Sequence, residues 1–114
     1  MPYLSIQTNQ NLSKDRTTEF LQKASQTVSA MLGKPENYVM VAIQDASPMM
    51  FAGTTDPAAY LQLKSLGLPE TATADFSQLL CGFINKELGI AVERIYIEFS
   101  GPDRHMWGWN TKTF

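Results

Sequence analysis

The sequence predicts an α+β fold, a two-layer α/β sandwich in which duplicated β-α-β units form a four-stranded mixed sheet with two helices on one face. Two stretches carry apolar residues at helical spacing, and each ends at a glycine. Residues 32–39 and 88–95 share one order: helix end, glycine, five-residue loop, apolar strand. Right-handed crossovers would place both helices on the same face. We expect one domain, residues 1–114, because this length suits a single core.

The first β-α-β unit is predicted in the first third of the chain. Residues 3–8 indicate a short strand, and the polar residues 9–13 offer N-cap chemistry for a helix. The helical stripe consists of Phe20, Leu21, Ala24, Val28, Met31 and Leu32. Gly33 stands where a left-handed cap would end the helix, and Pro35 prevents its continuation. Residues 38–43 are apolar on both faces, a pattern typical of a strand in a covered parallel sheet.

The second unit is predicted in the last third, after a middle segment rich in proline and glycine. In that middle segment we expect a short strand around residues 49–53, and residues 58–66 fit either a helical turn or a strand. A helix is predicted over residues 72–88, with Gly89 as its stop. Its stripe consists of Phe76, Leu79, Leu80, Phe83, Ile84 and Leu88. Residues 95–99 alternate in character and predict the last strand.

The sheet face opposite the helices is expected to need a cover, because the predicted strands carry apolar residues on both faces. Hydrophobic residues make up 44% of the chain and charged residues 18%, which is somewhat charge-poor. A symmetric homo-oligomer that packs its sheets around an axis would supply that cover.

Composition argues against several classes of function. The net charge of −2 and the lack of a basic cluster argue against nucleic acid, and no apolar stretch is long enough to cross a membrane. The absence of a secretory signal favours the cytoplasm, although non-classical secretion stays open. Cys81 is the only cysteine, so we expect no internal disulfide and read it as a small buried residue. His105, the only histidine, is expected at the surface and lacks the companions of a metal site.

The amino terminus offers the most specific chemistry. Pro2 follows the initiator methionine, and small second residues generally permit removal of that methionine. Processing would give Pro2 a free secondary amine, a group that titrates near pH 8 and lower when buried. A neutral amine of this kind can serve as a general base close to neutral pH.

Several short motifs resemble those of the macrophage migration inhibitory factor family in order and spacing. They are Met1-Pro2, Thr8-Asn9, Gly33-Lys34-Pro35, Leu79-Leu80-Cys81-Gly82, Arg94-Ile95-Tyr96-Ile97 and Gly108-Trp109-Asn110. The resemblance spans the whole chain. It implies a homotrimer of β-α-β-β-α-β subunits in the tautomerase superfamily, with an active site at each subunit interface around the amino-terminal proline.

The reaction that this resemblance implies is the keto-enol tautomerisation of phenylpyruvate-like 2-oxo acids, with D-dopachrome as a side substrate. Pro2 would be the general base and acid, and no cofactor or metal would be needed. Lys34 matches the family's active-site lysine and would place a cation beside the substrate carboxylate and the developing enolate.

Further substrate-binding residues follow from the same resemblance. Leu66 matches a position whose backbone amide holds the substrate carboxylate, and Tyr96 matches a tyrosine contributed by the neighbouring subunit. Trp109 and Phe114 match aromatic positions near the pocket rim. The alternation of residues 95–99 is compatible with this, since it places Tyr96 on a more polar strand face.

The sequence also departs from the family pattern. Glu98 replaces an asparagine that reaches the substrate ring, and Trp107 replaces a valine at the pocket mouth, so substrate preference is open. Residues 57–61 lack the family's cysteine pair, which predicts no thiol-disulfide activity. Residues 10–13 lack the arginine of the receptor determinant, which leaves receptor binding open.

Three functional hypotheses are compatible with the sequence. The first is a cofactor-free tautomerase. The second is a cytokine-like or interaction protein that keeps the fold while its pocket is vestigial. The third is another reaction of the superfamily, the hydration or decarboxylation of an unsaturated acid, for which Glu98 could position water.

Overall fold

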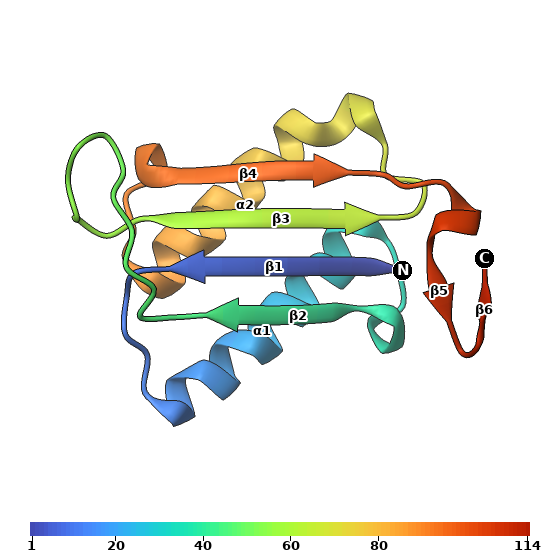
Figure 1. Ribbon diagram of the computed structural model, residues 1–114, viewed down its shortest axis with the longest axis horizontal. Coiled ribbons are helices and arrows are strands. Elements are labelled where there is room, and N and C mark those ends of the chain that lie inside the picture. Colours follow the sequence, from blue (N-terminus) through green and yellow to red (C-terminus); the bar gives the residue numbers. More distant parts are fainter.

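Two β-α-β units build the structure, as the sequence predicted (Figure 1). The computed structural model describes residues 1–114. The first unit consists of β1 (Pro2–Thr8), α1 (Lys14–Leu32) and β2 (Met40–Gln44), and the second of β3 (Ala59–Ser65), α2 (Thr73–Leu88) and β4 (Ile95–Ser100). The sheet order is β2-β1-β3-β4. Strands are parallel within each unit and antiparallel between β1 and β3, so the sheet is mixed.

Both helices cover the same face of this sheet (Figure 1). Their apolar stripes meet alternate residues of the strands, because successive strand residues point to opposite faces. In register, Leu4 of β1 lies beside Val41 of β2 and Leu63 of β3. The core thus forms between the two layers. Its fully buried members include Leu4, Ile6, Phe20, Val28, Leu61, Leu63, Leu80, Ile84 and Ile90.

The helix boundaries follow the capping residues of the sequence. The Ser13 hydroxyl accepts a hydrogen bond from the Arg16 backbone N–H at 3.2 Å and caps the start of α1. Gly33 and Gly89 end α1 and α2 with φ of 64° and 69°, the left-handed region that glycine adopts without strain. Both predicted stops are therefore confirmed.

The middle of the chain differs in part from the sequence prediction. The expected strand at residues 49–53 is wrong: a tight turn there has one isolated bridge between Phe51 and Thr54. The Arg94 guanidinium stabilises this local structure, because it donates to the carbonyls of Phe51, Thr54, Asp56 and Pro57. The sequence allowed either a helical turn or a strand at residues 58–66, and the structure forms the strand β3 there. A single 3-10 turn at Glu36–Tyr38 precedes β2.

The open face of the sheet, on the side away from the helices, is polar rather than apolar, contrary to the prediction. It presents Tyr3, Ser5, Gln7, Gln44, Tyr60, Gln62, Lys64, Tyr96 and Glu98, with Met40 and Ala42 as exposed apolar members. The Glu98 carboxylate accepts hydrogen bonds from Gln62 Nε2 at 3.0 Å and Tyr60 Oη at 3.3 Å. Side-chain hydrogen bonds across the strands therefore organise part of this face.

The chain ends in a hairpin that sequence patterns did not predict. A 3-10 turn at Arg104–Met106 leads into β5 (Gly108–Trp109), which pairs with β6 (Lys112–Thr113). The hairpin lies beyond the end of the sheet where β1 begins and β3 and β4 finish (Figure 1). It therefore brings the carboxyl-terminal segment close to the amino terminus. Among the helices, none has the length and hydropathy that a membrane crossing requires.

Candidate active site

A pocket of about 530 Å³ lies where β1 begins, between the sheet and the carboxyl-terminal segment. Three stretches of the chain line it: the first three residues, residues 37–40 at the entry to β2, and residues 107–109. Its lining is mainly hydrophobic, and Lys64 of β3 is the only charged side chain in it. An apolar pocket with few polar groups is typical of a site for a small organic molecule.

Pro2 lies at the wall of this pocket as the first residue of β1. It is less than 2% exposed and pairs with Ser65 across the sheet. With Met1 in place, the Pro2 nitrogen is part of a peptide bond, and the free amine belongs to Met1. Burial lowers the pKa of that Met1 amine, and the nearby Lys34 cation lowers it further. This environment therefore favours a neutral amine at the chain start.

Lys34 is positioned by the end of α1. Its backbone N–H donates to the Ser29 carbonyl at 3.1 Å, and the Ser29 hydroxyl donates to the Lys34 carbonyl at 2.6 Å. The side chain extends to the end of β3, where Nζ donates to the carbonyl of Leu66, the residue after the strand, at 3.4 Å. Leu66 is itself 6% exposed. The predicted residues Pro2, Lys34 and Leu66 thus lie at the same end of the sheet, but only Pro2 of the three lines the pocket.

Aromatic side chains form the wall contributed by the carboxyl-terminal segment. Trp107 and Trp109 both line the pocket, and the Phe114 ring stacks on Trp109 at 5.8 Å between centroids. The Phe114 backbone N–H donates to the Trp107 carbonyl at 3.3 Å, which fixes the chain end against the same wall. Tyr38 meets Trp109 edge to face at 6.0 Å. Sequence reasoning missed Tyr38, because its place in an apolar run made it look like part of a strand.

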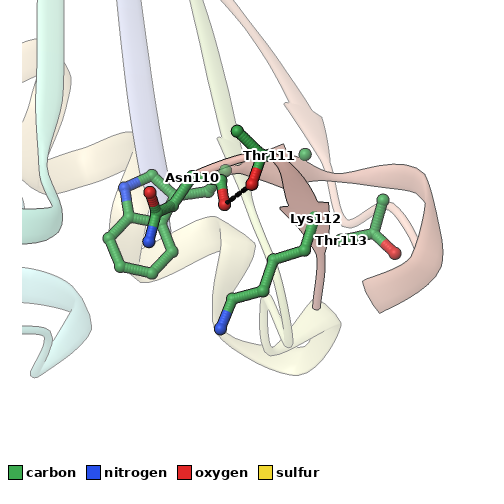
Figure 2. Close-up of a pocket in the computed structure, with 6 residues that line it drawn as sticks. Asn110, Thr111, Lys112 and Thr113 are labelled. Carbon is green, nitrogen blue, oxygen red and sulfur yellow. Dashed lines mark hydrogen bonds between the residues drawn. The ribbon is translucent and has the colours of Figure 1, made fainter.

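The hairpin turn presents a second, open depression lined by residues 108–113 (Figure 2). Asn110 and Thr111 occupy the left-handed region with φ of 52° and 64°, and the Thr111 hydroxyl donates to the Asn110 carbonyl at 2.6 Å. The Lys112 Nζ lies 5.9 Å from the centre of the Trp109 ring. Only one hydrophobic residue lines this depression. It lacks the enclosed apolar surface of the pocket at Pro2.

Tyr96 and Glu98 do not reach the pocket within one chain. Along β3, the partner of Tyr96 is Tyr60, whereas the partner of Pro2 is Ser65. A separation of five residues corresponds to about 16 Å along a strand. Tyr96 is 64% exposed on the open face. A site that includes Tyr96 and Glu98 beside Pro2 would require a second copy of the chain.

The remaining chemistry-bearing residues lie elsewhere. His105 is exposed, as predicted. Cys81 is only partly buried and packs against the core from α2, so the prediction of a buried cysteine holds in part. No group of three or more His, Cys, Asp or Glu side chains is arranged to hold a metal ion.

Comparison with known proteins agrees with this geometry. The family model described as "Macrophage migration inhibitory factor (MIF)" matches residues 1–114. The chain is 36% identical to a macrophage migration inhibitory factor homolog from Trichinella spiralis, with both chains covered in full. It is 37% identical to a homolog from Brugia malayi, over 100% of this chain and 99% of that one.

Solved structures give the same result. The crystal structure of a homologue from Prochlorococcus marinus has a TM-score of 0.91 and 41% sequence identity, with 98% of each chain covered. The structure from Trichinella spiralis has a TM-score of 0.90 and 33% identity, over 98% of this chain and 99% of that one. On these matches, which confirm the resemblance seen in the sequence, the chain belongs to the macrophage migration inhibitory factor family.

Proposed function

We propose that this protein is a cofactor-independent keto-enol tautomerase for phenylpyruvate-like 2-oxo acids. Membership of the family supports a tautomerase-like or cytokine-like function at a coarse level. The observation that carries the finer proposal is the position of the chain start, at the wall of an apolar pocket with the Lys34 cation nearby. Removal of Met1 would free the Pro2 nitrogen in this setting.

The proposed proton transfers need no other reagent. The neutral Pro2 amine takes a proton from the carbon next to the substrate carbonyl, and the electron pair of that C–H bond moves to give an enolate. The resulting ammonium then donates its proton to the enolate oxygen, which yields the enol and restores the amine. Lys34 stabilises the negative charge that develops during the first step. Leu66 would hold the carboxylate through its backbone N–H.

The complete site requires a second copy of the chain in this proposal. Tyr96 and Glu98 are too far from Pro2 within one subunit, and both are exposed on the open face. Family members typically form oligomers. We infer a homotrimer in which a neighbouring subunit brings Tyr96 and Glu98 to the pocket, while Trp107, Trp109 and Phe114 come from the same subunit as Pro2.

The test compares phenylpyruvate tautomerisation by the wild type with that by Pro2→Ala. Mass spectrometry must first confirm that each protein begins at residue 2, and light scattering must confirm a trimer. We expect the variant to lose about 10² to 10⁴ in kcat/KM, the usual contribution of a positioned base. Protein that retains Met1 is a matched control, because its Pro2 nitrogen is an amide and should be inactive.

A second candidate is a cytokine-like or interaction protein with a vestigial pocket. Two features favour it: the names of the relatives, and the carboxylate of Glu98 on the face proposed to meet the substrate. A correctly processed trimer without activity on phenylpyruvate, D-dopachrome or unsaturated acids would support this candidate over the tautomerase.

A further inference from the structure

We propose that Phe51 positions the Tyr96 ring, and that Arg94 acts through Phe51 to hold that ring in place. This inference rests on the proposed function, in which the Tyr96 ring of one subunit enters the pocket of a neighbour. No residue of the turn at residues 51–54 lines the pocket at Pro2 within one chain. Phe51 and Arg94 are therefore positioning residues, which act on the substrate only through Tyr96.

Tyr96 needs such support because of its place in the sheet. Its strand, β4, is an edge strand, so Tyr96 has a neighbouring strand on one side only, where its partner is Tyr60. Its side chain is 64% exposed. An exposed side chain samples several rotamers, and binding that selects one of them costs conformational entropy. A contact that orders the Tyr96 ring in advance lowers this cost.

The Phe51 ring makes that contact. The centroids of the Phe51 and Tyr96 rings lie 4.7 Å apart, with an angle of 62° between the ring planes. Aromatic pairs prefer this edge-to-face arrangement, because the positive edge of one ring meets the negative face of the other. Phe51 is half-buried and Tyr96 is exposed, so Phe51 is the better packed ring of the pair.

The turn that carries Phe51 has a backbone conformation that needs support. It belongs to the loop at the end of the sheet where β3 and β4 begin (Figure 1). Phe51 and Thr54 exchange two backbone hydrogen bonds, at 2.9 and 3.1 Å. Between them, Ala52 and Gly53 both have positive φ, 53° and 77°. Glycine adopts this region freely, but the Cβ of an alanine makes it costly. The turn therefore depends on contacts from outside it.

Arg94 supplies these contacts. Its guanidinium donates to four backbone carbonyls within residues 51–57, at 2.8 to 3.4 Å, and its Cζ lies 5.2 Å from the centre of the Phe51 ring. A planar guanidinium has a fork of five N–H donors that a lysine ammonium does not reproduce. Arg94 precedes Tyr96 by two residues. One short segment of the chain thus holds the turn and presents the ring that the turn supports.

Side-chain rotamers test the inference without turnover. Three-bond NMR couplings to the Tyr96 ring carbon report the χ1 populations of this side chain on the assembled protein. We expect one dominant rotamer in the wild type and averaging between rotamers in Phe51→Leu, which keeps an apolar side chain but loses the ring. Phe83→Leu is the matched control and should leave Tyr96 unchanged. Phe83 is also half-buried and pairs with an aromatic ring, that of Phe20 at 5.5 Å, on the helix layer.

Kinetics on processed, trimeric protein supply a second measurement. Phe51→Leu should raise KM for phenylpyruvate about twofold to tenfold, the range of one aromatic contact. It should change kcat little, because Tyr96 takes no proton in the proposed steps. Phe51→Tyr keeps the ring and should keep the KM. Arg94→Lys keeps the charge but loses the fork of donors, so it should raise KM as Phe51→Leu does. In a Tyr96→Ala background, Phe51→Leu should have no further effect.

Two outcomes would overturn the inference. One is a single Tyr96 rotamer in Phe51→Leu, and the other is a rise in KM that persists in the Tyr96→Ala background. If the processed wild type has no turnover, the tautomerase proposal fails, and the rotamer populations alone decide whether Phe51 positions Tyr96.

Discussion

The loops that follow the two helices have nearly the same backbone but serve different purposes. Each begins at a left-handed glycine, Gly33 or Gly89, and each continues into a single 3-10 turn before a strand. The next residue differs. Lys34 extends to the chain start and the Leu66 carbonyl, whereas Ile90 is 0% exposed in the core.

Side chains of the helices hold both loops in the same way. The Ser29 hydroxyl donates to the Lys34 carbonyl at 2.6 Å, and Asn85 Nδ2 donates to the Ile90 carbonyl at 3.0 Å. In both cases the donor lies five residues before the acceptor. The duplicated unit thus supplies a fixed backbone position, and the side chain at that position decides between a candidate binding group and a core contact.

The largest expected effect is the loss of stability in Ile90→Ala. Removing a fully buried isoleucine leaves a cavity and costs about 3 kcal/mol in the free energy of unfolding. Urea unfolding at a fixed protein concentration measures it, since oligomers unfold in a concentration-dependent way. The corresponding change Lys34→Ala should cost less than about 0.5 kcal/mol. Equal costs at the two positions would contradict the comparison.

Lys34→Ala should instead affect activity. If the lysine stabilises the developing enolate, its removal lowers kcat/KM for phenylpyruvate about 100-fold. Lys34→Arg keeps the charge and should recover part of the loss. Steady-state kinetics on trimeric, processed protein measure both variants. An activity of Lys34→Ala close to that of the wild type would remove Lys34 from the proposed mechanism.

The side-chain hydrogen bonds that hold the two loops should also differ in their effect on activity, although each contributes less than Ile90 or Lys34. Ser29→Ala and Asn85→Ala each remove one side-chain hydrogen bond, worth about 1 kcal/mol of stability. Only Ser29→Ala should also lower kcat/KM, because it loosens the loop that carries Lys34. Unfolding and kinetics measured on both variants decide this. A comparable loss of activity in Asn85→Ala would indicate a general effect of destabilisation.

The smallest expected effect is on pH dependence. Burial and the Lys34 cation both depress the pKa of the Met1 amine, with burial the larger cause. After removal of Met1, we expect the same two causes to act on the Pro2 amine. Activity that needs the neutral amine should rise with pH through a value below the ordinary pKa of about 8. Removing Lys34 removes one depressing cause, so in Lys34→Ala the rise should move to higher pH by less than about one unit. The pH profile of kcat/KM measures this shift, with Lys86→Ala as the control.

Local signals in the sequence predicted much of the fold. The helical stripes, the glycine stops and the repeated order of residues 32–39 and 88–95 were sufficient to place both β-α-β units. The turn at Phe51 was missed, because the Arg94 side chain that organises it lies about 40 residues away in the sequence. The polar open face was predicted only in the last strand, at Tyr96, because residues 38–43 are apolar on both faces and suggested that the whole sheet is covered.

For the candidate site, the sequence by itself determined which chemical groups are available, and the structure decided their placement. Residue types alone identify three features: a proline after the initiator methionine, a lysine after a glycine cap, and a tryptophan-rich end. Each depends only on neighbouring residues in the sequence. Only the tertiary structure brought Pro2, Lys64 and Trp107 together at one pocket and left Tyr96 about 16 Å away along the sheet. Such placement depends on strand register and on contacts between distant segments, which no local pattern specifies.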